Sequence, residues 1–234
     1  MTPSSVKFSS GLRPFYPHMS DSYNDQTTSD IALRFGGNRV HLHKIILKAA
    51  SGVWNQAFNS KLPISTKAEY VIQGHSDLVV YTMLQYIYGK PLDASPPEIP
   101  ENGRLDYLFD VFGIANEYQI PSLSEAVTER VVQLMKRHPI ERKQDTFYNV
   151  ISDTEIAEGK KMFGTVMSKT ADLYINNNVA DKSLLNGVLS TCFELVRNLK
   201  WLEENLDIIY LIGQHDPFCG RLLQLYLPML KFSG

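Results

Sequence analysis

Residues 31–42 carry the pattern that most restricts how this chain can fold. Apolar side chains stand at every second position on both sides of the run Gly36-Gly37-Asn38. They are Ile31, Leu33, Phe35, Val40 and Leu42. Because side chains along a strand alternate between its two faces, this spacing predicts two strands that share an apolar face. Glycine adopts positive φ without steric cost, so the run between the strands predicts a tight turn and hence a β-hairpin.

Helical spacing dominates the sequence after the hairpin. From Lys44 onward, apolar residues recur three and four positions apart, which is typical of helices that bury one face. One further short strand is predicted near residues 69–72, and the run His75-Ser76-Asp77 is predicted to supply the cap of the helix that follows it. Residues 90–104 contain four prolines and are predicted to form a loop.

Several later helix starts are marked by their capping residues. Ser122 with Glu125, and Ser152 with Glu155, have the spacing of a capping box, in which each side chain satisfies a backbone N–H of the other residue. The pair Asp216-Pro217 combines a good N-cap with proline at the first helical position, so it predicts a last helix.

The overall composition is that of a globular chain without a strong charge bias. The 234 residues are 44% hydrophobic, which is enough to bury one large core or two small ones. The 23 basic and 25 acidic residues leave a net charge of −2. This balance gives no overall attraction to nucleic acid or to an anionic membrane, so we expect direct binding to neither.

Cysteine usage and apolar runs indicate a compartment. Cys192 and Cys219 are far apart, and a secreted chain of this size more often carries a disulfide framework. We therefore expect two buried thiols in a reducing compartment. The start of the sequence lacks the apolar run of a secretory signal, and no later run approaches the roughly 20 residues that span a bilayer. The expected location is intracellular, in the nucleus or the cytoplasm.

Three regions follow from these patterns. Residues 1–28 are rich in Ser, Thr, Pro and Asn, and we expect a flexible N-terminal arm in which Phe15 and Tyr16 could dock on a partner subunit. Residues 29–137 hold the hairpin and the first helices. Residues 138–234 are expected to form a helical extension.

The hairpin and the helices after it resemble the opening of BTB/POZ domains. The resemblance lies in SDIALRFGGNRVHLHKIILKAASGVWNQAF: an acidic residue starts a strand, and a glycine turn, a His-basic pair, a small-residue helix and an aromatic follow. In this chain these features are Asp30, Gly36-Gly37, His43-Lys44, Ala49-Ala50-Ser51 and Trp54. Two later segments, TMLQYIYGKPLD and VFGIANEYQIPSLSEAVTERV, resemble the family's tyrosine-rich third helix and its last two helices.

The resemblance implies both a fold and a kind of function. The fold is α+β: a BTB/POZ domain over residues 29–137, with a small, mostly antiparallel sheet capped by helices, then an all-helical region over residues 138–234. The proline-rich loop and the helical half are similar to a fungal group of the family with a C-terminal helical extension. The implied function is protein–protein interaction, with two copies pairing through the first helix and the N-terminal segment.

Asp30 and Lys44 are the charged pair that the resemblance singles out. In family members that recruit co-repressors, an acid and a base at the matching positions line a charged pocket near the dimer interface. The competing interpretation, which we favour, is a local ion pair that fixes the strand against the first helix. His43 is expected to be packed and hydrogen-bonded rather than to bind a metal.

No motif of a catalytic, metal or cofactor site stands out. The sequence contains no G-x-S-x-G elbow, H-E-x-x-H pair, Walker loop or G-x-G-x-x-G run. His41, His43 and His75 could suggest a metal, but no cysteine or carboxylate cluster accompanies them. We therefore expect no catalytic residue, no metal and no cofactor.

Two further sets of residues concern partners. Many BTB adaptors of cullin ubiquitin ligases carry a hydrophobic-x-Glu motif after the second helix. The matching residues here are Leu62-Pro63-Ile64, so Leu62 supplies the hydrophobic position and Ile64 stands in place of the glutamate. Tyr86 and Tyr88 lie on or near the third helix, where tyrosine suits either an interface or the core.

The function that we predict is that of a non-enzymatic protein-interaction module. We expect a BTB/POZ scaffold that associates with itself as a homodimer, and transcription regulation is one use of such a scaffold. The alternative is a substrate adaptor that links a client protein to a cullin-based ubiquitin ligase.

Overall fold

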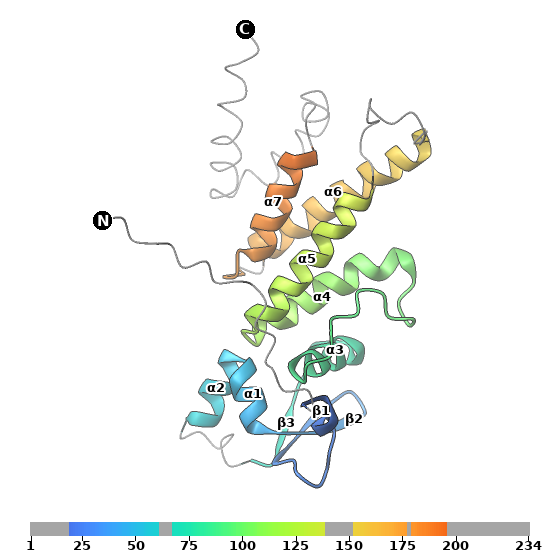
Figure 1. The fold of residues 1–234 in the computed structure, drawn as a ribbon. Coiled ribbons are helices and arrows are strands. Elements are labelled where there is room, and N and C mark those ends of the chain that lie inside the picture. Colours follow the sequence, from blue (N-terminus) through green and yellow to red (C-terminus); the bar gives the residue numbers. More distant parts are fainter. Residues whose placement is uncertain (1–18, 61–66, 139–151, 177–178, 196–234) are drawn as a thin grey trace, which may run out of the picture. The chain divides into compact units, whose positions relative to one another are not determined.

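The computed structural model of the 234-residue chain describes residues 19–60, 67–138, 152–176 and 179–195 (Figure 1). The chain forms two compact units, residues 1–93 and residues 94–234. The first unit holds η1 (Met19–Ser22), β1 (Ile31–Phe35), β2 (Asn38–Leu42), α1 (Lys44–Ala50), α2 (Gly52–Asn59), β3 (Glu69–Val71) and α3 (Asp77–Ile87). The second holds η3 (Glu101–Gly103), α4 (Arg104–Glu117), α5 (Pro121–Arg137), α6 (Asp153–Asn176) and α7 (Ser183–Leu195).

The predicted hairpin is confirmed as part of a three-stranded sheet in the order β2-β1-β3. β1 and β2 are antiparallel, with Ile31 opposite Leu42 at one end and Phe35 opposite Asn38 at the other. β3 runs parallel to β1, so the sheet is mixed, although the antiparallel pair is the longer one. The parallel pairing is possible because α1 and α2 form the crossover between the strands.

The alternation along the hairpin separates a fully buried face from one that is exposed at its arginines, although Ala32 on that second face is buried. The apolar residues of the predicted pattern are all buried: Ile31, Leu33, Phe35, Val40 and Leu42. The ring of Phe35 meets the ring of Tyr81 on α3 at 4.8 Å and 81°, an edge-to-face contact. The other face carries Arg34 and Arg39, which are exposed.

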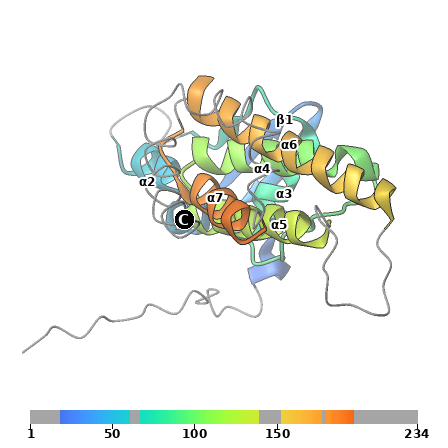
Figure 2. The same ribbon diagram turned by 90° about the horizontal axis from the view of Figure 1, so that it is seen from above.

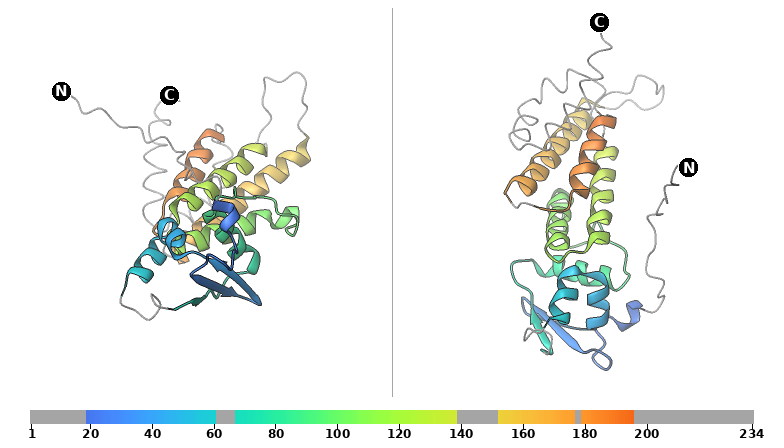
Figure 3. Two further views of the ribbon diagram at one scale, coloured as in Figure 1. Left: turned by 60° about the horizontal axis from the view of Figure 1, so that its bottom comes forward. Right: turned by 90° about the vertical axis from the view of Figure 1, so that its left-hand side faces the viewer.

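Helices α1 and α2 follow each other directly (Figure 3), and Ser51 is the residue between them. The backbone N–H of Ser51 donates to the carbonyl of Leu47 and so ends α1. The hydroxyl of Ser51 accepts a hydrogen bond from the backbone N–H of Trp54 at 3.2 Å and so caps α2. This tight corner buries Trp54 completely.

Two of the three predicted caps are confirmed, and within the run His75-Ser76-Asp77 the serine is the capping residue. Ser76 accepts from the backbone N–H of Val79 at 3.4 Å. Ser152 and Glu155 form a full capping box: the N–H of Ser152 donates to Glu155 at 2.8 Å, and the N–H of Glu155 donates to the Ser152 hydroxyl at 3.2 Å.

The predicted cap at Ser122 is wrong. Helix α5 already begins at Pro121, with Ile120 as its N-cap and no side-chain cap bond. The competing signal is the proline itself, because its fixed φ and missing N–H suit the first helical position. Ser122 therefore lies inside the first turn.

In the second unit, α5 packs between α4 and α7 (Figures 1 and 2). The apolar stripe of α5 is buried: Leu123, Val127, Val131 and Met135. On α7, Gly187 permits a close approach, because a Cβ there would lie 2.6 Å from Cγ2 of Thr128 on α5. On α6, Lys169 forms an ion pair with Asp106 of α4.

A tyrosine joins the end of α6 to the start of α7. The hydroxyl of Tyr174 donates to the carbonyl of Asp181 at 2.6 Å and accepts from the N–H of Leu185 at 3.3 Å. Burial raises the pKa of Tyr174 to about 12, so the hydroxyl keeps its proton at any physiological pH. The predicted last helix from Asp216, and the side chains of both cysteines, lie outside the described residues. Within the described ranges no helix is long and apolar enough to cross a membrane.

The hairpin turn gives a sharp test of this fold. Gly36 has φ +52, and a Cβ there would collide with the carboxylate of Asp77 at the start of α3. Gly37 has open space around it. We expect Gly36→Ala to lower the free energy of unfolding by about 1–3 kcal/mol, because the alanine adds strain and a clash. Gly37→Ala, one residue away, is expected to change it by less than about 0.5 kcal/mol. Urea denaturation of both variants measures the difference, and equal midpoints would contradict this account of the turn.

Candidate interaction surface

The start of α1 is held by a carboxylate from the beginning of the sheet. The N-cap residue of α1, His43, makes no capping bond with its side chain. Asp30 takes this role from 14 residues away: its Oδ1 accepts the backbone N–H of Lys44 at 2.7 Å. A carboxylate at a helix N-terminus also interacts favourably with the helix dipole. The two residues singled out in the sequence are therefore brought together, through the backbone of one of them.

The side chain of Lys44 faces the second helix. Its ammonium lies 5.8 Å from the centre of the Phe58 ring on α2, within the range of a cation–π contact. Lys44 thus links α1 to α2 while Asp30 links α1 to β1. A role of this pair in binding a partner stays a prediction.

His43 is packed and hydrogen-bonded, as the sequence predicted. The hydroxyl of Tyr88 accepts the backbone N–H of His43 at 2.8 Å and lies 3.0 Å from its Nδ1. The Nε2 of His43 lies 3.0 Å from the hydroxyl of Thr28. Since the Thr28 hydroxyl gives its own hydrogen to Asp25, its oxygen accepts from His43, which assigns a ring proton to Nε2.

The hydrogen-bond network runs from Tyr88 through His43 and Thr28 to the carboxylate of Asp25, and the protonation state of each end group is set by its surroundings. The hydroxyl of Thr28 donates to Asp25 at 2.6 Å. Hydrogen bonds from the hydroxyl of Thr28 and from Thr27 lower the pKa of Asp25 to about 2. Burial raises the pKa of Tyr88 well above its usual range. Near neutral pH, Asp25 is therefore charged and Tyr88 protonated, which suits an acceptor at one end of the network and a donor at the other.

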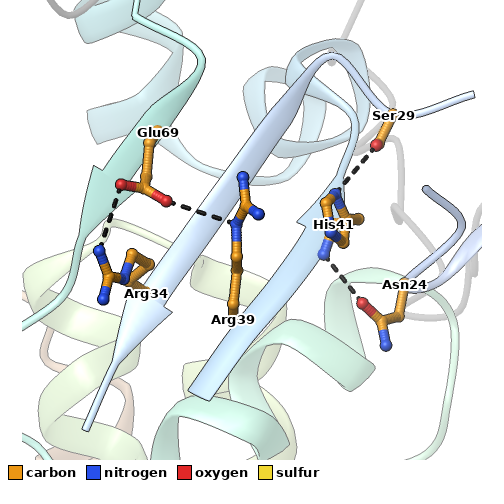
Figure 4. A network of polar contacts seen from close by, with 6 residues as sticks. All are labelled: Asn24, Ser29, Arg34, Arg39, His41 and Glu69. Carbon is orange, nitrogen blue, oxygen red and sulfur yellow. Dashed lines mark hydrogen bonds and ion pairs between the residues drawn. The ribbon is translucent and has the colours of Figure 1, made fainter. Parts of the chain in front are cut away.

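Residues 19–28, which the sequence placed in a flexible arm, contact the rest of the first unit through Thr28, as described above, and through Tyr23 and Asn24. The ring of Tyr23 packs edge-on against Tyr88 at 5.4 Å, and the ammonium of Lys90 lies 5.4 Å from the centre of the Tyr23 ring. Asn24, with φ 60, accepts the backbone N–H of His41 on β2 at 2.9 Å (Figure 4). This segment therefore lies against β2 and the end of α3.

Next to this network, α1 exposes an apolar face. Ile45 is 71% exposed, and Ala49, one turn further along, is exposed as well. Residues four apart lie on the same face of a helix, so the two form one stripe. Among the described residues, the exposed large hydrophobic side chains are Ile45 and Val71. An exposed apolar stripe on a firmly held helix is suited to packing against another protein.

The other predicted site residues fall in different places. Tyr86 lies on α3 and is half-buried, whereas Tyr88 is fully buried and belongs to the core. Leu62 and Ile64 lie outside the described residues. In the part of the chain that the structure describes, no three His, Cys, Asp or Glu residues are grouped so that they could hold a metal ion.

Sequence reasoning missed the residues of the N-terminal segment. One local signal was present: Asp25 followed by Thr27 and Thr28 is a pattern in which an aspartate accepts hydrogen bonds from the residues just after it. The structure forms these bonds, at 2.9 Å from the N–H of Thr27 and 2.7 Å from its hydroxyl. The contact of Tyr23 with Tyr88 has no such local signal, since the two residues are far apart in sequence.

Removal of one hydroxyl tests the network. Tyr88→Phe leaves the backbone N–H of His43 without its acceptor in a part-buried site. We expect the free energy of unfolding to fall by about 1–3 kcal/mol. Tyr70→Phe on β3 is the matched control, since no described residue hydrogen-bonds to the Tyr70 hydroxyl. The control is expected to change stability by less than about 0.5 kcal/mol in urea denaturation. Similar losses in the two variants would mean that the Tyr88 hydroxyl does not hold this junction.

Comparison with known proteins gives the family. Residues 19–134 match the family model described as BTB/POZ domain. The chain is 25% identical to human Rabankyrin-5 over 208 residues, which is 87% of this chain and 16% of that protein. The mouse Rabankyrin-5 is 25% identical over 211 residues, 86% of this chain and 16% of the mouse protein. Human Kelch-like protein 41 is 23% identical over 105 residues, 45% of this chain and 16% of that protein.

These relatives are much longer than the chain, which spans about one sixth of their length. What they share with it is therefore a module. BTB/POZ domains are protein-interaction modules, and an exposed apolar helix face beside a hydrogen-bonded junction agrees with that use. The chain belongs to the BTB/POZ domain family through residues 19–134.

Proposed function

We propose that two copies of this chain pair through α1 and the segment at residues 19–30, and that the pair serves as a scaffold for other proteins. The observation that carries the proposal is the 71% exposure of Ile45. Burial of a side chain of this size contributes about 1.5–3 kcal/mol per copy. A two-fold pairing would bury it twice, because both copies present the same stripe.

The junction at the start of α1 supports this role. Asp30 holds the first backbone N–H of α1, and Tyr88 holds that of His43 one residue earlier. A helix fixed in this way loses little further conformational freedom when it binds, which reduces the entropic cost of association. We assign Asp30, His43 and Tyr88 to positioning α1, and Ile45 to the contact itself.

The helical extension supplies further surface for a client protein. The Rabankyrin-5 similarity covers 87% of this chain and so extends beyond the BTB/POZ match into the extension. Transcription regulation is one setting for such a scaffold. The net charge of −2 favours action through bound proteins rather than through direct contact with nucleic acid.

Solution mass tests the pairing. We expect light scattering of the wild-type chain to give twice its 26.5 kDa mass at micromolar concentration. Ile45→Glu is expected to raise the dissociation constant about 100-fold or more, because it replaces buried apolar area with a desolvated charge. Its circular dichroism should be unchanged, since the residue is exposed. Val71→Glu, at the other exposed hydrophobic position, is the control and should keep the wild-type mass. A monomeric wild type, or equal masses for wild type and Ile45→Glu, would refute pairing through α1.

The alternative function is that of an adaptor for a cullin ubiquitin ligase. It rests on the similarity to Kelch-like protein 41 and on Leu62, the hydrophobic residue of the adaptor motif. We expect calorimetric titration with a cullin N-terminal domain to give no binding tighter than about 10 μM, because Ile64 lacks the carboxylate of the motif. Ile64→Glu restores that carboxylate and should strengthen binding. Submicromolar binding by the wild-type chain would favour the adaptor over the scaffold.

A further inference from the structure

The two edges of the three-stranded sheet are covered to different degrees. At the β2 edge, the amide oxygen of Asn24 accepts the backbone N–H of His41, a group that points away from β1 (Figure 4). A side chain that binds an edge N–H in this way prevents another strand from pairing there. The N-terminal segment thus protects one edge of the sheet.

The β3 edge has no such protection among the described residues. β3 pairs with β1 over three residues, and two further backbone bonds flank the pairing: Ala32 N–H to Ala68 O and Ile72 N–H to Arg34 O, both at 2.8 Å. Alternate residues of a strand point their backbone N–H and C=O groups to opposite sides of the strand. Those of Glu69 and Val71 therefore point away from β1, toward the free edge of the sheet. No hydrogen bond from the described part of the chain reaches them.

The side chains at this edge do not discourage pairing. Edge strands commonly carry charged residues or proline, which block the approach of another chain. The charged residue of β3, Glu69, is engaged by Arg34 and Arg39 within the sheet. Here Val71 is 53% exposed and lies opposite Arg34 in the register. An exposed β-branched residue on an open edge offers apolar contact to a strand laid beside it.

The charge on the same face is not balanced. Arg34 and Arg39 are direct cross-strand partners, an arrangement of like charges that is unfavourable by itself. Both contact the single carboxylate of Glu69, at 3.6 Å and 3.4 Å (Figure 4). Each guanidinium makes this contact through one nitrogen, and the two side chains are 59% and 56% exposed. The guanidinium groups are therefore accessible, and a guanidinium binds carboxylates best through two of its N–H donors.

We propose that residues 68–72, with Arg34 and Arg39, bind an extended acidic segment of a partner protein as a fourth strand of the sheet. Main-chain hydrogen bonds to Glu69 and Val71 supply the affinity. Arg34, on the strand next to β3, is the arginine near enough to meet a carboxylate of the added strand, and Arg39 on β2 adds positive charge from further away. The segment alternates acidic residues on the arginine face with apolar or neutral ones on the other. This site is separate from α1, so the partner differs from the second copy proposed above.

The test is a titration of the full ¹⁵N-labelled chain with short end-blocked peptides, followed by amide NMR shifts. A seven-residue peptide of alternating glutamate and valine should shift the amides of residues 68–72 at about 1 mM, the range expected of a weak single-strand contact. The same peptide with lysine for glutamate should not, and neither should one with a central proline, which removes a main-chain donor. Raising the salt from about 50 to about 300 mM should weaken binding, because both arginines are exposed.

Variants separate charge recognition from the open edge. Arg34→Gln with Arg39→Gln should reduce the affinity for the acidic peptide about five-fold or more. Arg130→Gln on α5 is the matched control and should leave it unchanged. The proposal is overturned if the acidic peptide shifts no amide in residues 68–72, if the lysine peptide binds equally well, or if those amides shift with protein concentration alone. The last outcome would mean that a second copy occupies the edge.

Discussion

Tyr88 connects three segments of the first unit that are far apart in sequence. It is fully buried just after α3, yet it accepts the N–H of His43 where β2 gives way to α1. The ring of the same residue supports Tyr23, and His43 extends the network to Thr28. One side chain therefore connects the end of α3, the start of α1 and the N-terminal segment. A buried hydroxyl is costly when unpaired, so its partners have to be correctly placed before the site is stable.

The features that could be predicted from the sequence are those whose causes are local. The hairpin follows from a period of two around Gly36 and Gly37, and the capping box of Ser152 and Glu155 from a spacing of three residues. The cap at Ser122 failed because two local signals competed, and the proline one residue earlier set the start of α5. Contacts between distant segments have no such signature. Glu69 bridges two arginines that are far away in sequence, and Asn24 reaches the edge of β2 across 17 positions. The hydrogen-bonded contacts of Asp30 and His43 were accordingly anticipated and those of Tyr23 and Asn24 were missed, while a role of any of them in binding a partner stays a prediction.

The family match and the structural units divide the chain differently. Residues 19–134 match the BTB/POZ model, but the boundary between the two units falls after residue 93. Helices α4 and α5 thus belong to the family domain by sequence and share a unit with α6 and α7. Gly187 shows how closely they share it, since even one added methyl group on α7 would meet Thr128 on α5. Such packing makes the extension part of the core of this unit, because exposing the apolar stripe of α5 would cost burial free energy. The similarity to Rabankyrin-5 over 208 residues agrees with a module longer than the BTB/POZ domain alone.

The apolar stripe on α1 and the β3 edge differ in the forces through which they can bind a partner. The stripe of Ile45 and Ala49 on α1 carries no charge, so association through it depends on apolar area and little on salt. The β3 edge combines main-chain donors with exposed guanidinium groups, and its interactions weaken as salt screens them. A single extended strand against three residues of β3 is a weak contact by itself. If two copies pair through α1, however, they present two β3 edges, and a partner with two acidic segments binds the second one at a high effective concentration. Pairing through the apolar helix would in this way make a weak, charge-selective edge strong enough to be used.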